Sequence, residues 1–169
     1  TDREGRARVA PLGLRRIEAV LRHRLDLNAP DVLVTTPEAL PRRLGPWTRA
    51  VLLSSSDPLG EGMSNTTTRS FQRGELYTAR WMRGLTRRIV RAKDKHGFSV
   101  LAGGAGAWQW LRSPDTARRQ GIDCVLDGYF EARGPDLVAD ALAGRPLPEQ
   151  VRQGGCCLEH IQPIAAPST

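Results

Sequence analysis

Two loops rich in small and hydroxyl-bearing residues are the parts of this chain best suited to chemistry. One runs from Ser54 to Ser64, opens with three consecutive serines and contains Asp57-Pro58 and two glycines; the other runs from Ala102 to Trp108 and contains three glycines. Hydroxyls donate and accept hydrogen bonds, and glycine lets a ligand approach the backbone closely. With Ser64 to Thr68 at its end, the first loop predicts a ligand that carries amides, a ribose and phosphate. The alternative is an ordinary Ser/Thr-rich surface loop.

Each loop directly follows a short apolar run, Ala50 to Leu53 in one case and Phe98 to Leu101 in the other. Such runs, bounded by Gly and Ser, are typical of buried parallel strands, and open α/β sheets bind ligands beyond the carboxyl ends of these strands. We therefore expect the two loops to form one floor for a cofactor. Trp108 and Trp110 either belong to the core or wall this site.

The rest of the chain alternates between predicted helices and strands. We expect helices over residues 11–24, 37–44, 77–95 and 135–142, and strands over residues 31–35, 50–53, 98–101 and 122–126. This alternation is typical of an α/β fold with a doubly wound parallel sheet, flavodoxin-like or Rossmann-like. Because the chain opens on a helix, we expect the first strand to be missing upstream or replaced by residues 6–10.

Composition favours one compact domain in a reducing compartment. Of 169 residues 40% are hydrophobic, and no stretch approaches the roughly 20 apolar residues that a membrane-spanning helix needs. We expect a cytoplasmic protein without a membrane partner. The three cysteines, Cys124, Cys156 and Cys157, lack the spacing of a zinc site. The second loop matches neither a dinucleotide fingerprint nor a P-loop.

The net charge of +7 raises the question of a nucleic-acid partner. The arginines gather on two predicted helices, which also carry apolar stripes; in the second helix Tyr77, Trp81, Leu85 and Ile89 form a four-residue ladder. Solvated helix faces explain this pattern, and no binding motif or interleaved aromatic residues accompany the charge. We therefore expect no nucleic-acid partner.

Four motifs follow one another along the chain: Arg49-Ala-Val-Leu-Leu-Ser-Ser-Ser-Asp-Pro-Leu-Gly-Glu-Gly62, then Ser64 to Thr68, then Ser99-Val-Leu-Ala-Gly-Gly-Ala-Gly-Ala-Trp-Gln109, then Gly121-Ile-Asp-Cys-Val125. Together they resemble the N-terminal cobalamin-binding domain of cobalamin-dependent radical SAM enzymes. The resemblance covers most of residues 11–148. It implies a cobalamin-binding domain over residues 1–150 and a linker over residues 151–169 towards an absent radical SAM core, so we expect the chain to be a fragment.

The resemblance also assigns residues to the cofactor. Ser54 and Ser55 would meet the nucleotide tail, Asp57, Gly60 and Gly62 would form a turn under the lower face, and Gly103, Gly104 and Gly106 would lie against tail or ring. Further contacts are implied for Leu59, Ser64, Thr66, Ala107, Trp108, Gly128 and Glu131. The chain departs from the family where Ala105 replaces a proline, and where Tyr129 and Phe130 interrupt a Gly-Glu-Gly-Glu run.

The implied chemistry is methyl transfer from cobalamin to a substrate radical, or another radical conversion that uses the same binding module. The chain lacks the Asp-x-His-x-x-Gly motif that supplies a histidine to cobalt, so we expect cobalamin without histidine ligation. It also lacks the Cys-x-x-x-Cys-x-x-Cys motif of the [4Fe-4S] cluster, which would work with S-adenosylmethionine in the core domain. By itself the chain should bind without turnover. The alternative is a non-catalytic Rossmann-like module that binds a nucleotide or a partner protein.

Overall fold

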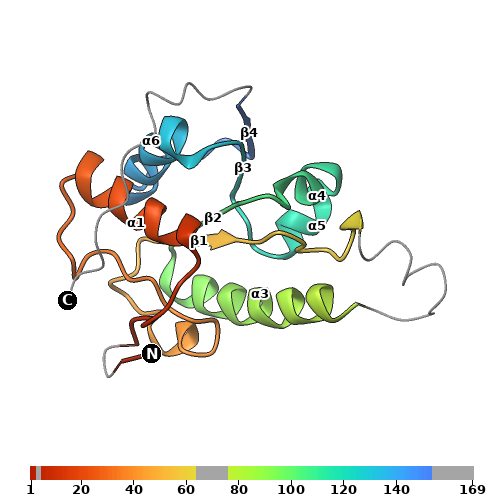
Figure 1. The fold of residues 1–169 in the computed structure, drawn as a ribbon, viewed down its shortest axis with the longest axis horizontal. Coiled ribbons are helices and arrows are strands. Elements are labelled where there is room, and N and C mark those ends of the chain that lie inside the picture. Colours follow the sequence, from red (N-terminus) through yellow and green to blue (C-terminus); the bar gives the residue numbers. More distant parts are fainter. Residues whose placement is uncertain (3–4, 64–75, 154–169) are drawn as a thin grey trace.

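The computed structural model describes residues 1–2, 5–63 and 76–153, and it has the predicted α/β architecture (Figure 1). Its elements in chain order are α1 (Leu12–Arg24), the 3-10 helix η1 (Leu40–Arg42), β1 (Ala50–Ser54), α3 (Tyr77–His96), β2 (Ser99–Gly103), α4 (Ala107–Arg112), α5 (Pro114–Arg119), β3 (Cys124–Asp127), α6 (Phe130–Leu142) and β4 (Gln150–Arg152). In the described part of the chain, no helix is both long enough and apolar enough to cross a membrane.

The four strands form one parallel sheet in the order β1-β2-β3-β4. In the β1–β2 pair, Ala50 lies opposite Ser99 and Ser54 opposite Gly103. The carboxyl ends of these strands therefore lie at one edge of the sheet, as the apolar runs predicted.

Helices cover both faces of the sheet, because β1, β2 and β3 carry apolar side chains on both faces. Val51, Val100 and Val125 point into a core shared with α3, α4 and α5. Leu101, Cys124 and Leu126 point the other way, into a core shared with α1 and α6. Figure 1 shows α3 on one side of the sheet and α1 with α6 on the other. This two-layer covering is what parallel sheets require.

Helix α3 forms where the ladder predicted it, but only the last two of the four ladder residues are buried. Leu85 and Ile89 are buried, whereas Tyr77 is 77% and Trp81 37% exposed. Met82, the neighbour of Trp81, is 5% exposed, so the second turn of α3 is already packed into the core. A step of four residues turns about 40° beyond a full helical turn, so the ladder drifts around the helix. Tyr77 and Trp81 therefore lie on a different face of α3 from the buried Ile89.

The predicted strand over residues 31–35 and the predicted helix over residues 37–44 are both wrong as stated. Thr35 forms only an isolated antiparallel bridge with Arg6 outside the four-stranded sheet. The Arg6 guanidinium donates to the carbonyls of Ala29 (2.9 Å) and Val32 (3.4 Å), so this segment is bonded to a side chain rather than to a strand. Of residues 6–10, only the first two pair with residues 34 and 35. The predicted helix shortens to η1.

Three elements were not predicted, namely α4, α5 and β4, and α6 begins five residues before the expected Pro135. Glu131 pairs with Arg16 of α1 at 2.6 Å, and the Phe130 ring lies over Gly134, so the first turn of α6 is fixed by packing. β4 extends the sheet pairing to Arg152, into the region expected as linker. Residues 154–169 of that region lie outside the described residues.

The crossover between β3 and β4 has the opposite handedness to the crossover between β1 and β2. Both step across the sheet in the same direction, but α3 lies on one face and α6 on the other. Two such connections must have opposite hands, and crossovers between parallel strands are almost always right-handed. β4 is therefore best regarded as a three-residue addition to the edge of the wound sheet.

Candidate functional site

The two predicted loops lie side by side at the carboxyl edge of the sheet. The Ser55 backbone N–H donates to the Gly103 carbonyl (3.2 Å), and the Gly106 N–H donates to the Ser55 carbonyl (2.9 Å). On the far side of β2, a Cβ on Gly103 would lie 3.2 Å from the Leu126 carbonyl of β3. The ends of three adjacent strands thus form one continuous surface.

Two of the glycines are needed for this close approach of the loops to one another. Gly104 has φ of +92°, and a Cβ there would lie 2.7 Å from Ser54 Oγ and 2.9 Å from the Ser55 carbonyl. A Cβ on Gly106 would lie 2.7 Å from the Ser56 carbonyl. Contact between the loops therefore accounts for both glycines, whether or not a ligand also approaches them.

The Asp57 carboxylate holds its own loop in shape. Its Oδ1 accepts hydrogen bonds from the Gly62 N–H (2.9 Å) and from Gln109 Nε2 (2.8 Å), and its Oδ2 accepts one from Thr78 Oγ1 (3.2 Å). The Gln109 carbonyl in turn accepts from the Leu59 N–H at 2.7 Å. The predicted turn exists, and the Asp57 side chain points into it rather than outward.

Gln109 is the residue of this site that the sequence analysis did not assign. Its side chain is fully buried, and its amide connects α4 to the turn that follows β1. A polar residue among Ala107, Trp110 and Leu111, all buried in α4, could have drawn attention to it. The next residue along, Trp108, is only partly buried and lies under the Arg112 guanidinium at 5.6 Å.

Trp110 belongs to the core and does not wall the site. It is fully buried and donates from its indole N–H to Gln120 Oε1 at 2.7 Å. Ala107 is also buried, Gly60 is buried with φ of +74°, and Leu59 packs partly against the core. These residues support the loops from below.

The exposed residues above the strand ends form a surface that we call the carboxyl-edge shelf. Each is the last residue of β1 or lies in the loop after β1, β2 or β3, and each is open to solvent, with Tyr129 52% exposed. The members of the shelf are Ser54, Ser56, Gly104, Ala105, Gly128 and Tyr129. Ser55 is partly buried beside them. The predicted Ser64 and Thr66 lie outside the described residues.

Glu131 does not belong to this shelf. It is buried in the first turn of α6, where it forms the ion pair with Arg16. Gly128 has φ of +131° and packs closely against the backbone of Gln153. The β3 loop therefore contributes Gly128 and Tyr129 to the shelf, and Glu131 holds α6 against α1.

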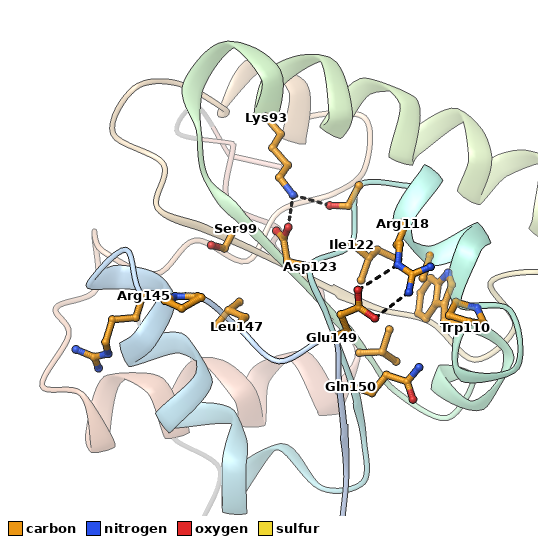
Figure 2. Close-up of a pocket in the computed structure, with 15 residues that line it drawn as sticks. Lys93, Ser99, Trp110, Arg118, Ile122, Asp123, Arg145, Leu147, Glu149 and Gln150 are labelled. Carbon is orange, nitrogen blue, oxygen red and sulfur yellow. Dashed lines mark hydrogen bonds and ion pairs between the residues drawn. The ribbon is translucent and has the colours of Figure 1, made fainter.

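The larger of two cavities that we describe, about 440 Å³, lies at the opposite, amino-terminal edge of the sheet (Figure 2). Lys93 reaches from α3 to Asp123 (2.5 Å), and Arg118 of α5 forms a two-pronged pair with Glu149 (3.1 and 3.0 Å). The Arg118 guanidinium lowers the pKa of Glu149, which in turn raises the pKa of Arg118. Because Lys93, Arg118 and Glu149 are each paired within the chain, none of the three offers an unpaired charge to a ligand in this cavity.

Among the described residues no group of three or more His, Cys, Asp and Glu side chains could hold a metal ion. His23 and His96 lie in the last turns of α1 and α3, away from both loops. Comparisons of this chain with models of protein families, with curated proteins and with solved structures give no match.

Proposed function

We propose that the carboxyl-edge shelf binds cobalamin, and that this chain is the cofactor-binding part of a cobalamin-dependent radical SAM methyltransferase. The observation that carries the proposal is the juxtaposition of the hydroxyl-rich β1 loop with the glycine-rich β2 loop on adjacent strand ends. These are the two loops that bear the family-like motifs, and ligands of open α/β sheets bind at this edge.

The donors and acceptors of the shelf fit a large, flat group with amide substituents. Ser54 and Ser56 offer exposed hydroxyls, which can donate to an amide carbonyl or accept from an amide N–H. Gly104 and Ala105 beside them are exposed and carry no bulky side chain, so a planar group can lie close to this backbone. Asp57 would act by holding the turn, since its carboxylate is already engaged.

The chemistry that cobalamin supplies when bound is methyl transfer through cobalt. In this proposal the described histidines take no part in holding it, since both lie outside the loops. The [4Fe-4S] cluster and S-adenosylmethionine would belong to a radical SAM core, in the same polypeptide or a partner chain. The role of the present residues is to bind and orient the cofactor.

The test is retention of hydroxocobalamin by the purified chain, measured from its visible absorbance after desalting. Ala105→Trp should reduce the retained cobalamin at least tenfold, because Ala105 is exposed on the shelf and an indole there would cover it. Ala143→Trp is the matched control: Ala143 is also exposed but follows α6 at the opposite edge of the sheet.

Two results would contradict the proposal. One is the absence of retained cobalamin in the unsubstituted chain, confirmed folded by circular dichroism. The other is equal retention by both tryptophan variants. Binding of ATP or NAD in place of cobalamin, blocked by the same Ala105→Trp change, would identify the shelf as the site of a nucleotide-binding module instead.

A further inference from the structure

Helix α3 carries a row of arginines whose charges are not neutralised within the described part of the chain. Four exposed arginines and one exposed lysine have no hydrogen-bond or ion-pair partner there: Arg80, Arg87, Arg88, Arg91 and Lys95. They extend over about 22 Å of helix. By contrast, Lys93 on the same helix is paired with Asp123. The unpaired row is therefore a cationic surface available to a partner.

The first turns of α3 add aromatic side chains to this surface. A groove of about 320 Å³, which we call the α3 groove, lies between α3 and the segment before η1. Its lining includes Tyr77, Trp81, Arg80, Arg88, Pro37 and Glu38. Tyr77 and Trp81 are exposed because they lie on the strip of α3 that also carries Arg88, and not on the strip of the buried Met82 and Ile89. The aromatic residues that appeared to belong to a buried ladder thus stand beside two unpaired arginines.

The spacing of these residues places them on one strip of the helix. Positions 77, 81, 84 and 88 are three or four residues apart, so they are neighbours on the helix surface. Gly84 lies between Arg80 and Arg88, and nothing lies within 4 Å of where its Cβ would be. A flat ring could therefore enter the α3 groove against Trp81 with cations on either side.

We propose that the α3 groove and the adjoining arginine row bind single-stranded nucleic acid. A base would stack on Trp81 or Tyr77, and successive phosphates would lie along Arg88, Arg91 and Lys95. Aromatic platforms combined with a cationic track are how proteins hold single strands without reading their sequence. An acidic peptide would use the arginines but would have less use for the exposed aromatic rings, so a single strand fits the surface better.

This inference revises the expectation that no nucleic acid is bound, which rested on reading the arginines as solvated helix faces without a binding motif or interleaved aromatic residues. It does not depend on cobalamin binding. The shelf is formed by the loops after β1, β2 and β3, whereas the groove is formed by α3 and the residues before η1.

The test is fluorescence anisotropy of labelled 12-nucleotide probes, oligo(U) RNA and oligo(dT) DNA, titrated with the chain over a range of NaCl concentrations. Arg80→Gln/Arg88→Gln should weaken binding at least tenfold. It should also lower the slope of log K against log salt by about 1.4, since each phosphate contact on a single strand contributes about 0.7. Trp81→Ala should weaken binding about tenfold with little change in this slope, and Trp81→Phe should restore much of it.

The matched control is Arg24→Gln/Arg152→Gln, which removes the same charge from exposed positions in α1 and β4. It should leave affinity within about threefold of the unsubstituted chain, because nonspecific attraction depends only weakly on two distant charges. Unequal binding of the RNA and DNA probes would show which sugar the groove prefers and would support the proposal in either case.

Four results would overturn the proposal. Two concern the chain and its variants: no binding of either probe at about 150 mM NaCl, or the same loss of affinity in the two double arginine variants. Two concern competing ligands: a duplex probe that binds as tightly as the single strands, or polyglutamate that displaces the probe as effectively as unlabelled oligo(U). The last two would indicate a general cationic surface or an acidic protein partner. Circular dichroism of each variant confirms that the surface changes leave the fold intact.

Discussion

At the scale of single residues, the Asp57–Gln109 contact decides the shape of the loop that follows β1. Gln109 is fully buried and satisfies both ends of its amide within this loop, one on Asp57 and one on Leu59. Buried polar groups are costly when they lose a partner, because the remaining donor or acceptor is then desolvated and unpaired. The contact therefore couples the β1 loop to α4, which follows the β2 loop.

We predict that Gln109→Glu destabilises the chain more than Gln109→Leu at pH 7. A glutamate would place a carboxylate oxygen where Nε2 now donates to Asp57, so two negative charges would face each other at about hydrogen-bond distance. Either change should cost about 2 kcal/mol or more of unfolding free energy. The penalty of the glutamate variant should shrink as pH falls towards about 5, where the two carboxylates can share a proton.

Urea denaturation followed by circular dichroism at pH 7 and pH 5 measures this effect. Gln120→Glu is the control, because the Gln120 carbonyl oxygen accepts the Trp110 indole N–H and glutamate keeps an acceptor there. If Gln109→Glu unfolds at the same urea concentration as Gln120→Glu at pH 7, the contact with Asp57 does not stabilise the loop.

At the scale of elements, α3 contains two glycines for which the same substitution should have opposite effects. Gly97 caps the helix in the left-handed conformation (φ +72°) and donates its N–H to the Lys93 carbonyl at 2.7 Å. Gly84 lies in the interior of the helix, and neither glycine has an atom within 4 Å of its would-be Cβ. Their difference is therefore conformational and not a matter of space.

We predict that Gly97→Ala lowers the free energy of unfolding by about 1 kcal/mol, because an alanine is strained at positive φ. Gly84→Ala should raise it by up to about 1 kcal/mol, because alanine restricts the unfolded chain and favours the helix. Thermal denaturation of the two variants beside the unsubstituted chain measures both signs. Equal shifts in the same direction would contradict the assignment of Gly97 as the cap.

The elements differ in how well their sequences predict them. The α3 helix is long and amphipathic and ends at His96-Gly97, so local pattern and capping agree about its existence and its end. The α4 and α5 helices have six residues each, too few for a helical period to be recognised. The segment over residues 31–35 is rich in β-branched residues, yet the Arg6 side chain, 23 and 26 positions away, binds the carbonyls of Ala29 and Val32.

At the scale of the whole molecule, Cys124 reports on the integrity of the fold. Its side chain is fully buried in the core between the sheet, α1 and α6. Burial, and to a lesser degree the nearby Asp123 carboxylate, raises the pKa of the Cys124 thiol to about 11. The thiolate is the reactive form of cysteine, so this thiol should be inert in the folded chain.

We predict that, in a Cys156→Ser/Cys157→Ser background, Cys124 fails to react with a disulfide reagent at pH 8 until urea unfolds the chain. Because the folded pKa of Cys124 lies above its ordinary value of 9.0, its contribution to stability is fully present below pH 9. That contribution should be lost as pH rises through about 11. Cys124→Ala should flatten the fall in unfolding free energy over this range; rapid reaction of the thiol without urea would contradict its burial.

The sequence by itself determined the fold class, β1, β2, β3, α1 and α3, and the adjacency of the two loops. These follow from local apolar runs, from periodicity, and from the rule that parallel strands bring their carboxyl ends to one edge. For the same reason Ser54 and Gly103 could be expected side by side from one sequence, and the register confirms that they are.

Only the tertiary structure decided which of the candidate residues are available to a ligand. Asp57 and Glu131 are equally polar in the sequence, but contacts with Gln109 and Arg16 engage both inside the protein, while Ser54 remains exposed. Likewise, Tyr77 and Trp81 share a four-residue spacing with Leu85 and Ile89, but each such step turns about 40° beyond a full helical turn, so the two aromatic residues reach an exposed face of α3. Spacing shows which residues share a strip of the helix, whereas the packing of the helix against the sheet decides which strip is buried.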